Sequence, residues 1–453
     1  MTTGAVILVV VLLLLVLLAC RMPVWLALAG SGAAGLFLLR GEKFVTSSLG
    51  AVPFDQTSTF SLTIIPMFIL MGTFAVKANI AEQVFAVAQR GFRKLPGGLG
   101  ISTVAACAGF AAVSGSTIGT AATMANLSVN QMRKAGYPTS LAGALVAVAG
   151  TLGAMIPPSV FLVLYAILAG ESIAQMLAAG IIPGVLSAIA YMVYIGLRTR
   201  KMQLVDPAAA ETDSALGEAL EQARSGAAAQ KLRLPFRGVV RLAILFIIIM
   251  GGIYSGIFTP TESAAVGALA AAVMLVLEFR RAGARELWIR VIDALQETAR
   301  TTSMVFAIIV GSAILSLFFV VARVPQTVTD AVTSLDVPGW LILALLLAFL
   351  IPLGMALESI SILVITVPLL YPVAMELGFD GIWLGILIVK LIEIGMVTPP
   401  VGINCFVVAG TAGIKSSEVF RGVWPFVVME IGLVALFFAT PSLVLWLPSL
   451  VVQ

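Results

Sequence analysis

Residues 151–160 read TLGAMIPPSV, which places a glycine and two adjacent prolines in the middle of an apolar segment. A proline inside a helix removes a backbone donor and clashes with the carbonyl group one turn earlier. The loss is more costly in a bilayer, because hydrocarbon contains no water to satisfy the freed backbone groups. Pro157 and Pro158 therefore indicate either the end of a helix or a break within a membrane span that something else occupies.

The composition is that of a polytopic membrane protein. Of the 453 residues, 60% are hydrophobic and 11% are charged, against about 25% charged residues in ordinary soluble domains; the mean hydropathy is +1.11. The chain has no histidine, and its three cysteines (Cys20, Cys107 and Cys405) lie far apart. This excludes histidine-ligated haem and CxxC-type metal sites and argues against a disulfide framework. The net charge of +4 is attributed to membrane topology rather than to nucleic-acid binding.

Twelve apolar segments organise the chain. Eight are regular runs that can cross a bilayer, which takes about 20 residues: 4–20, 23–39, 60–78, 177–197, 239–257, 263–279, 303–322 and 424–448. Four are irregular: 98–130, 140–168, 339–375 and 381–411. The start of the chain, MTTG, lacks the positive region of a signal peptide, so the first run is predicted to be a retained span. One long polar stretch, 198–238, is predicted to be a cytoplasmic linker between the halves.

The two halves can be aligned at a constant offset of 242 residues, the spacing between Pro157 and Pro399. The matches run without a gap from residue 96 to residue 183: Pro96-Gly97 with Pro338-Gly339, Gly136-Tyr137 with Gly378-Phe379, Gly143 with Gly385, Gly153 with Gly395, Pro157-Pro158 with Pro399-Pro400, Gly180 with Gly422 and Pro183 with Pro425. Glycine and proline are frequent in membrane helices, but a constant register that aligns both Pro-Pro pairs indicates an internal repeat.

Charge patterns predict that the two repeats are inverted. Basic residues flank segment 98–130 on both sides: Arg90, Arg93, Lys94, Arg133 and Lys134. Lysine and arginine favour the cytoplasmic side, so both ends are placed inside and the segment is predicted to be a re-entrant hairpin. Its equivalent, 339–375, is flanked by Asp336, Glu376 and Asp380, and both its ends are placed outside. Inverted repeats of this kind are typical of secondary transporters.

Two amphipathic stretches, 80–95 and 284–300, precede a hairpin and a span and mix apolar residues with charges. Helices that lie in the membrane interface have this pattern. An ordinary cytoplasmic connector is the alternative interpretation.

The breaks can now be interpreted as binding elements. Each hairpin has a small, polar middle: AVSGSTIGT at 112–120 and LGMALESIS at 353–361. Each is followed by a span broken at Pro-Pro, and unwound backbone at membrane depth is tolerated where it lines a cavity. Its carbonyl oxygens suit a small cation, and the positive N-termini of the half-helices suit an anionic substrate. Two tips that meet two broken spans would form two pseudo-symmetric cation sites around one substrate site.

Six ionisable residues in or near the apolar segments need a separate explanation, because intramembrane charge is usually functional. Glu358 lies in a hairpin tip and is the strongest candidate. Lys390 and Glu393 are three residues apart, a spacing that allows them to neutralise each other on one helix. Glu171, Glu262 and Glu430 lie near predicted span ends, where we expect them to be solvated.

The sequence resembles the large membrane subunit of tripartite ATP-independent periplasmic (TRAP) transporters, the DctM-like family, over essentially its whole length. The motifs that carry the resemblance are IPMFILMG at 65–72, AAVSGSTIGTAATM at 111–124, GYPTSLAGAL at 136–145, GTLGAMIPPS at 150–159 and EIGMVTPPVGIN at 393–404. Glu358 is a departure, because aspartate is more usual in the family after this glycine-rich turn.

The resemblance implies a multi-pass protein of the bacterial inner membrane that imports small organic anions, driven by sodium. It implies an all-α fold in which a transport domain moves as an elevator against a scaffold domain. The implied partners are a periplasmic substrate-binding protein (DctP-like), a separate small membrane subunit (DctQ-like), the carboxylate substrate and the lipid bilayer. The domain boundaries expected on this basis are 1–95 for scaffold spans with the first arm helix, 96–176 for the first transport repeat, 177–337 for scaffold spans with the linker and the second arm helix, 338–422 for the second transport repeat, and 423–453 for a C-terminal scaffold span.

By the same resemblance, two Na⁺ sites are expected. One would use Ser114 with backbone oxygens of Gly153, Ile156 and Pro158; the other would use Gly354, Gly395, Thr398 and Val401. The substrate contacts would be Ser116, Thr117, Ser159 and Asn404, with Glu358 as a further candidate from its place in the hairpin tip.

Three other functions remain to be separated from this one. A stand-alone sodium-coupled dicarboxylate symporter would share the hairpin plan but would need no binding protein. A respiratory membrane anchor would hold haem through histidine, which this chain lacks. A channel would not exchange labelled substrate by counterflow. No polar segment contains a nucleophile–base arrangement, so an enzyme is not expected.

Overall fold

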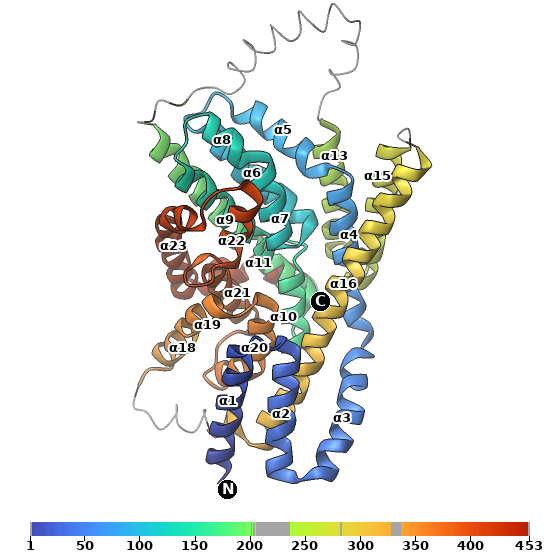
Figure 1. The fold of residues 1–453 in the computed structure, drawn as a ribbon, viewed down its shortest axis with the longest axis vertical. Helices are drawn as coiled ribbons and strands as arrows, with labels where there is room; N and C mark the ends of the chain where they lie inside the picture. Colours follow the sequence, from blue (N-terminus) through green and yellow to red (C-terminus); the bar gives the residue numbers. More distant parts are fainter. Residues whose placement is uncertain are drawn as a thin grey trace, which may run out of the picture.

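The computed structural model describes residues 2–200, 202, 204, 236–280, 283–327 and 337–451, and helices are the only regular secondary structure in these ranges (Figure 1). Seven of the described helices are long and apolar enough to cross a membrane, or eight if the bent pair α9 (Thr139–Met155) and α10 (Val160–Ala169) is taken as one span. The predicted all-α polytopic fold is confirmed. Of the predicted linker 198–238, residues 201, 203 and 205–235 lie outside the described residues.

One group of helices comes from two separate parts of the sequence and packs together. The long helix α16 contacts α2, α3 and α4, α15 packs on α4, and α13 packs on α5. The close packing depends on glycine: a β-carbon on Gly32 of α2 would lie 2.7 Å from the Cα of Leu315 in α16. The members of this group are α1 (Thr3–Ala19), α2 (Val24–Arg40), α3 (Glu42–Thr57), α4 (Ile64–Lys77), α5 (Ile80–Phe92), α13 (Phe236–Phe246), α14 (Gly252–Tyr254), α15 (Pro260–Phe279) and α16 (Ala284–Val321).

Two sequence expectations for the spans need correction, and one helix was not expected. The second arm 284–300 and the span 303–322 are one continuous helix, α16, because the polar run 301–303 lowers hydropathy without breaking the backbone. The run 424–448 is not one span: α23 (Ser416–Ala439) ends at Ala439 and is followed by the short helix α24 (Pro441–Leu445). Helix α24 packs on α11 (Ile173–Thr199) and α21 (Gly381–Val397). Helix α3 was not predicted; Glu42, Lys43 and Pro53 keep it from standing out as an apolar run.

The first repeat is a helical hairpin followed by a broken span, as predicted. The hairpin consists of α6 (Gly98–Ser114), α7 (Thr117–Met124), a π-helical turn (Ala125–Val129) and α8 (Asn130–Lys134). The span consists of α9 (Thr139–Met155) and α10 (Val160–Ala169), which are bent by 42° at the break. The break falls at Pro157 and Pro158, where Ile156 and Ser159 have extended backbone.

The second repeat has the same plan. Its hairpin consists of α18 (Gly339–Ala348), α19 (Leu350–Ala356) and α20 (Ser359–Glu376), and its span of α21 (Gly381–Val397) and α22 (Ile403–Ala412). The peptide bond between the two prolines is cis in both breaks. Figure 1 shows the first hairpin towards one end of the molecule and the second towards the other, as an inverted repeat requires.

Two further spans pack directly against the broken ones. Helix α11 (Ile173–Thr199) contacts α6, α9 and α21, and α23 contacts α9 and α21. Glycine again allows the approach: a β-carbon on Gly422 of α23 would overlap the carbonyl oxygen of Ser140. Both broken spans are therefore enclosed within the protein, and α9 is buried along almost its whole length.

Candidate functional site

The two hairpin tips meet at a cavity of about 160 Å³. The first tip contributes residues 114–119, the second contributes Glu358 and Ile360, and α10 contributes its first two residues. Helices α4 and α16 close the opposite side. The cavity therefore lies between the two repeats and the separate group of helices.

The first tip is ordered by its own hydroxyl groups. The Ser116 hydroxyl oxygen accepts a hydrogen bond from the Gly119 amide at 3.1 Å and caps the N-terminus of α7. The Ser114 hydroxyl lies 2.8 Å from the Thr120 hydroxyl. Ser114 and Thr117 are buried, whereas Ser116 is exposed towards the cavity that it lines.

Glycines bring the first tip onto the first break. A β-carbon on Gly153 would lie 2.9 Å from the Ser116 carbonyl oxygen, and one on Gly115 would lie 3.0 Å from the Pro158 carbonyl oxygen. The structure thus places Ser114, Gly153 and Pro158 of the predicted first cation set on facing surfaces. Ile156, the fourth member, lies in the same break and is half-buried.

The second tip approaches the second break through a pair of glycines. A β-carbon on Gly354 would lie 2.8 Å from the Gly395 Cα atom, so the two backbones touch. Thr398 lies at the end of α21 and donates its hydroxyl hydrogen to the Ile394 carbonyl at 2.6 Å, which leaves its oxygen lone pairs available to a cation. Val401, also in the predicted second set, is 38% exposed. Because its side chain is a hydrocarbon, only its backbone oxygen can act as a cation ligand.

Glu358 occupies the position equivalent to Ser116 and makes the same kind of contact. Its carboxylate accepts hydrogen bonds from the Ser361 amide at 3.4 Å and the Ser361 hydroxyl at 3.2 Å, which caps α20. The acid therefore has a local structural role besides its place in the cavity wall.

Two of the predicted substrate contacts lie away from this cavity. The Ser159 hydroxyl is fully buried; it donates to the Ala154 carbonyl at 2.5 Å across the break and accepts from the Leu162 amide at 3.4 Å as the cap of α10. Asn404 is fully buried and donates from its side-chain amide to the Ala147 carbonyl at 3.3 Å, which joins α22 to α9. Ser116, Thr117 and Glu358 are brought together at the cavity. By contrast, Ser159 bridges the first break, and Asn404 joins the second half of the second broken span to α9.

The cavity wall combines three helix N-termini with two acidic side chains, and no basic side chain is among its described lining residues. The N-termini of α7, α10 and α20 all contribute first-turn residues to its wall, and a helix N-terminus carries about half a positive charge with unsatisfied amide groups. The charged residues in the wall are Glu297 and Glu358. Glu358 is engaged with Ser361, and Glu297 of α16 lies 3.9 Å from the Lys77 ammonium.

A buried ion cluster lies behind the second break. The Lys390 ammonium is 2.7 Å from a Glu393 oxygen and 2.6 Å from a Glu430 oxygen, and it donates to the Ser187 hydroxyl at 3.0 Å. Tyr191 donates to the other Glu430 oxygen at 2.5 Å. The pairing of Lys390 with Glu393 is confirmed, but the expected solvation of Glu430 is wrong, because its side chain is only 5% exposed. The cluster joins α11, α21 and α23.

The other two acids have local roles. Glu262 forms a capping box with Thr259 at the start of α15 and is exposed at a span end, as expected. Glu171, in the turn between α10 and α11, accepts a hydrogen bond from the Tyr371 hydroxyl of α20 at 2.8 Å. That bond ties the base of the second hairpin to the first broken span.

Sequence reasoning missed the far wall of the cavity, which α4 and α16 supply. A β-carbon on Gly72 would lie 2.6 Å from the Ser114 carbonyl oxygen, and the Thr73 hydroxyl lies 2.9 Å from that of Thr298. Gly72 ends the motif IPMFILMG, and Thr301 belongs to a polar run inside an apolar helix. The sequence signal was available in both cases, because a glycine and a group of hydroxyl residues lie within otherwise apolar segments.

Comparison with known proteins gives one consistent result. Residues 11–443 match the family model described as "Tripartite ATP-independent periplasmic transporter, DctM component". The chain is 33% identical to a C4-dicarboxylate TRAP transporter large permease protein of Pseudomonas aeruginosa, over 92% of this chain and 93% of that protein. It is 31% identical to the sialic acid large permease protein of Vibrio cholerae and 30% identical to the ectoine/5-hydroxyectoine large permease protein of Ruegeria pomeroyi, with 96% of this chain covered in both.

A solved structure supports the fold. The crystal structure of the Alcanivorax borkumensis YdaH transporter superimposes with a TM-score of 0.60 over 89% of each chain, at 14% sequence identity. At this identity the likeness concerns the fold alone.

Proposed function

Because the chain belongs to the DctM component family of tripartite ATP-independent periplasmic transporters, and is therefore a multi-pass permease of the bacterial inner membrane, we propose that it imports a small organic anion driven by sodium. Its relatives are named for substrates as different as C4-dicarboxylates, sialic acid and ectoine. The anion is a carboxylate in this proposal.

The observation that carries the proposal is the cavity between the hairpin tips. The first turns of α7, α10 and α20 all border one small space that is also lined by Ser116 and Thr117. Amides at helix N-termini bind carboxylates without any basic side chain. Substrate binding is proposed to use Ser116, Thr117 and the first turns of α7, α10 and α20.

The two Na⁺ sites are proposed where each tip touches its break. The first set (Ser114, Gly153, Ile156 and Pro158) and the second (Gly354, Gly395, Thr398 and Val401) consist of hydroxyl and carbonyl oxygens, which suit a hard cation. The close contacts of Gly153 and Gly395 with the opposing tips support this placement. A bound cation would draw each tip onto its break and so complete the wall of the substrate cavity.

We further propose an elevator mechanism with a revised division of the chain. The moving body contains both repeats, and we add α11 and α23 to it because the Lys390 cluster and the packing on α9 and α21 join them to the broken spans. The supporting body contains α1–α5 and α13–α16. The cavity lies at the boundary between the two bodies, where movement would expose it to either side.

The family description makes the chain one component of a tripartite system. We propose that the other two are a small membrane subunit (DctQ-like) and a periplasmic substrate-binding protein (DctP-like). A relative from Oleidesulfovibrio alaskensis, 29% identical, is named permease protein DctMQ, and this chain covers 59% of its length. The name of this relative supports a DctQ-like partner for the DctM component.

Uptake by proteoliposomes tests the proposal. The chain is reconstituted with the small subunit, and uptake of a labelled C4-dicarboxylate, sialic acid and ectoine is measured with and without an inward Na⁺ gradient and with and without the binding protein. We expect uptake of one anion that requires both the gradient and the binding protein. Uptake that is independent of Na⁺ would contradict sodium coupling, and uptake without the binding protein would favour the stand-alone symporter.

A further inference from the structure

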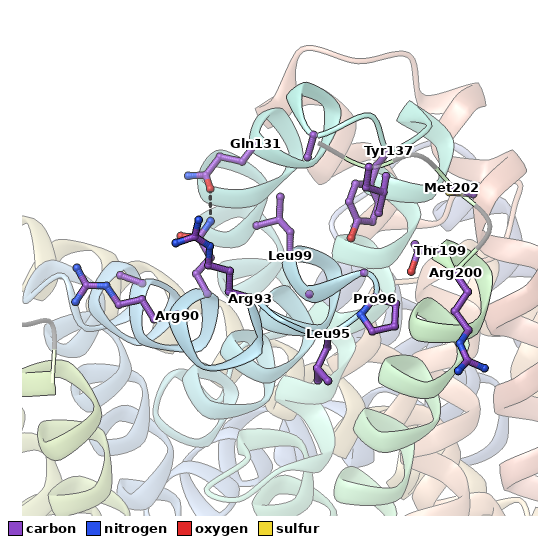
Figure 2. A pocket seen from close by; sticks show the side chains of 16 residues that line it. Arg90, Arg93, Leu95, Pro96, Leu99, Gln131, Tyr137, Thr199, Arg200 and Met202 are labelled. Atoms are coloured by element: carbon purple, nitrogen blue, oxygen red, sulfur yellow. Dashed lines mark hydrogen bonds between the residues drawn. The ribbon is translucent and has the colours of Figure 1, made fainter. Parts of the chain in front are cut away.

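A second and larger pocket lies at the end of the molecule where the first hairpin has its base. It has a volume of about 680 Å³ and lies between α5, the start of α6, the turn between α8 and α9, and the end of α11 (Figure 2). It shares no lining residue with the cavity between the tips. The 17 residues of α6 separate the two spaces by about 25 Å. We call this space the rim pocket.

The charged residues of the rim pocket are all basic. Arg90, Arg93 and Arg200 line it, and no acidic residue is among its described lining residues. Figure 2 shows Arg90 and Arg200 on opposite flanks, with Arg93 beside Gln131 between them. Arg90 and Arg200 are exposed, so their long side chains can reorient towards a bound anion. The guanidinium group suits phosphate because it can donate two parallel hydrogen bonds.

The polar and apolar parts of the pocket fit an amphipathic ligand. The Tyr137 hydroxyl accepts a hydrogen bond from the Gly100 amide at 3.2 Å, which leaves its own hydrogen available to an anion. Burial raises the pKa of Tyr137, so the phenol remains a neutral donor at physiological pH. Leu95, 48% exposed, and Pro96 form an apolar edge beside the arginines.

The position in the membrane identifies the class of ligand. The positive flanks of the first hairpin place this end of the molecule on the cytoplasmic side. Anionic lipids give the cytoplasmic leaflet a negative surface potential, and basic pockets between helices on this side bind their headgroups. We propose that the rim pocket binds the phosphate headgroup of an anionic phospholipid of the cytoplasmic leaflet, with its acyl chains along the edge formed by Leu95 and Pro96.

The rim pocket lies between the supporting body and the moving body of the proposed elevator. Helix α5 belongs to the supporting body, whereas α6, α8 and α11 belong to the moving body, so a lipid in the rim pocket contacts both. Binding itself does not depend on sodium coupling or on transport. A measurement of lipid binding therefore distinguishes failure of the lipid site from failure of the proposed transport function.

Native mass spectrometry of the full-length chain in detergent micelles tests the site. The probes are dioleoyl phosphatidylglycerol, dioleoyl phosphatidylcholine, which has the same chains and no net charge, and inorganic phosphate as a competitor. We expect one phosphatidylglycerol to be retained in preference to phosphatidylcholine and not to be displaced by an equimolar amount of phosphate. Equal retention of both lipids, or displacement by phosphate, would overturn an anionic phospholipid as the ligand.

Three variants locate the binding. Each surface cation contributes a factor of about five to the binding of an anionic lipid, so Arg90→Gln with Arg200→Gln should weaken it about 25-fold. Arg280→Gln with Arg285→Gln removes the same charge from exposed positions outside the pocket and should change binding less than twofold. Ala86→Trp fills the pocket without changing the charge and should also abolish retention.

Protein that elutes and melts as the wild type is used for every comparison. If Ala86→Trp retained phosphatidylglycerol as the wild type does, or if both arginine pairs weakened binding equally, the lipid would be held by general surface charge and the pocket assignment would be overturned.

Discussion

The two broken spans follow the same backbone plan but are surrounded by different chemistry. Both have a glycine pressed against a hairpin tip, at Gly153 and Gly395, and both break at a proline pair. The tips are capped at equivalent positions by different residues, a serine at Ser116 and a carboxylate at Glu358. The duplication therefore preserves positions where the backbone must bend or approach closely, and side chains that only need to accept a hydrogen bond have diverged.

The larger difference lies behind the breaks. Lys390 and Glu393 of the second span correspond to Val148 and Thr151 of the first. The first break is thus supported by apolar packing and a hydroxyl, whereas the second is tied to α11 and α23 by ion pairs that are almost completely buried. Removing one member of a buried ion group leaves the others uncompensated, so the second half should be far more sensitive to single substitutions.

The largest expected effect comes from Lys390→Met, which leaves the Glu393 and Glu430 carboxylates without their cation. Breaking a buried pair in this way costs about 3–5 kcal/mol. Thermal unfolding in detergent should show a marked loss of stability. Lys390→Met with Glu393→Gln and Glu430→Gln should recover most of it, and a single variant as stable as the wild type would show that the cluster does not anchor the second break.

The contact between each tip and its break gives the next effect. A methyl group at Gly395 would lie 2.5 Å from the Gly354 Cα atom, and one at Gly153 would lie 2.9 Å from the Ser116 carbonyl oxygen. Gly395→Ala and Gly153→Ala should each destabilise the protein by about 1–3 kcal/mol and abolish Na⁺-dependent uptake. Gly410→Ala, in α22 with open space around it, is the control; wild-type uptake by Gly395→Ala would contradict the second cation site.

The two caps should give the smallest effects. Ser116→Ala should cost about 1 kcal/mol through the loss of the α7 cap, and Glu358→Ala should cost a similar amount at α20. Glu358→Gln keeps an oxygen that can accept from Ser361, so its stability should stay close to that of the wild type. Hydrogen exchange of the amides in the first turns of α7 and α20 measures the loss of each cap. A greater loss of protection in Glu358→Gln than in Glu358→Ala would exclude the capping role.

The backbone breaks could be predicted from the sequence because their causes are local. Proline lacks an amide hydrogen and fixes φ, so Pro157-Pro158 and Pro399-Pro400 mark the breaks whatever packs around them. The continuity of α16 could not be predicted from hydropathy, since the hydroxyl residues 301–303 lower the hydropathy of the segment without interrupting the helix.

Contacts between distant residues account for most of what the sequence did not reveal. Glu430 looked like a solvated residue because its partner, Lys390, lies on another helix, and the two meet only when α21 packs on α23. Ser159 and Asn404 stand in the right motifs, yet the hydrogen bonds of Ser159 to Ala154 and of Asn404 to Ala147 direct their side chains into the packing of the breaks. The roles of Gly72 and Thr301 depend on which helices close the cavity, which the order of motifs along the chain does not specify.

The most direct test of the whole account is the sidedness of the two hairpin bases. In a Cys20→Ser background, Leu95→Cys and Val337→Cys introduce thiols at exposed positions, 48% and 37% accessible, beside the starts of α6 and α18. A membrane-impermeant maleimide applied to right-side-out and inside-out vesicles should label Val337→Cys only in the former and Leu95→Cys only in the latter. Labelling of both thiols from the same side would contradict the inverted repeat, and with it the paired cation sites and the shared substrate cavity.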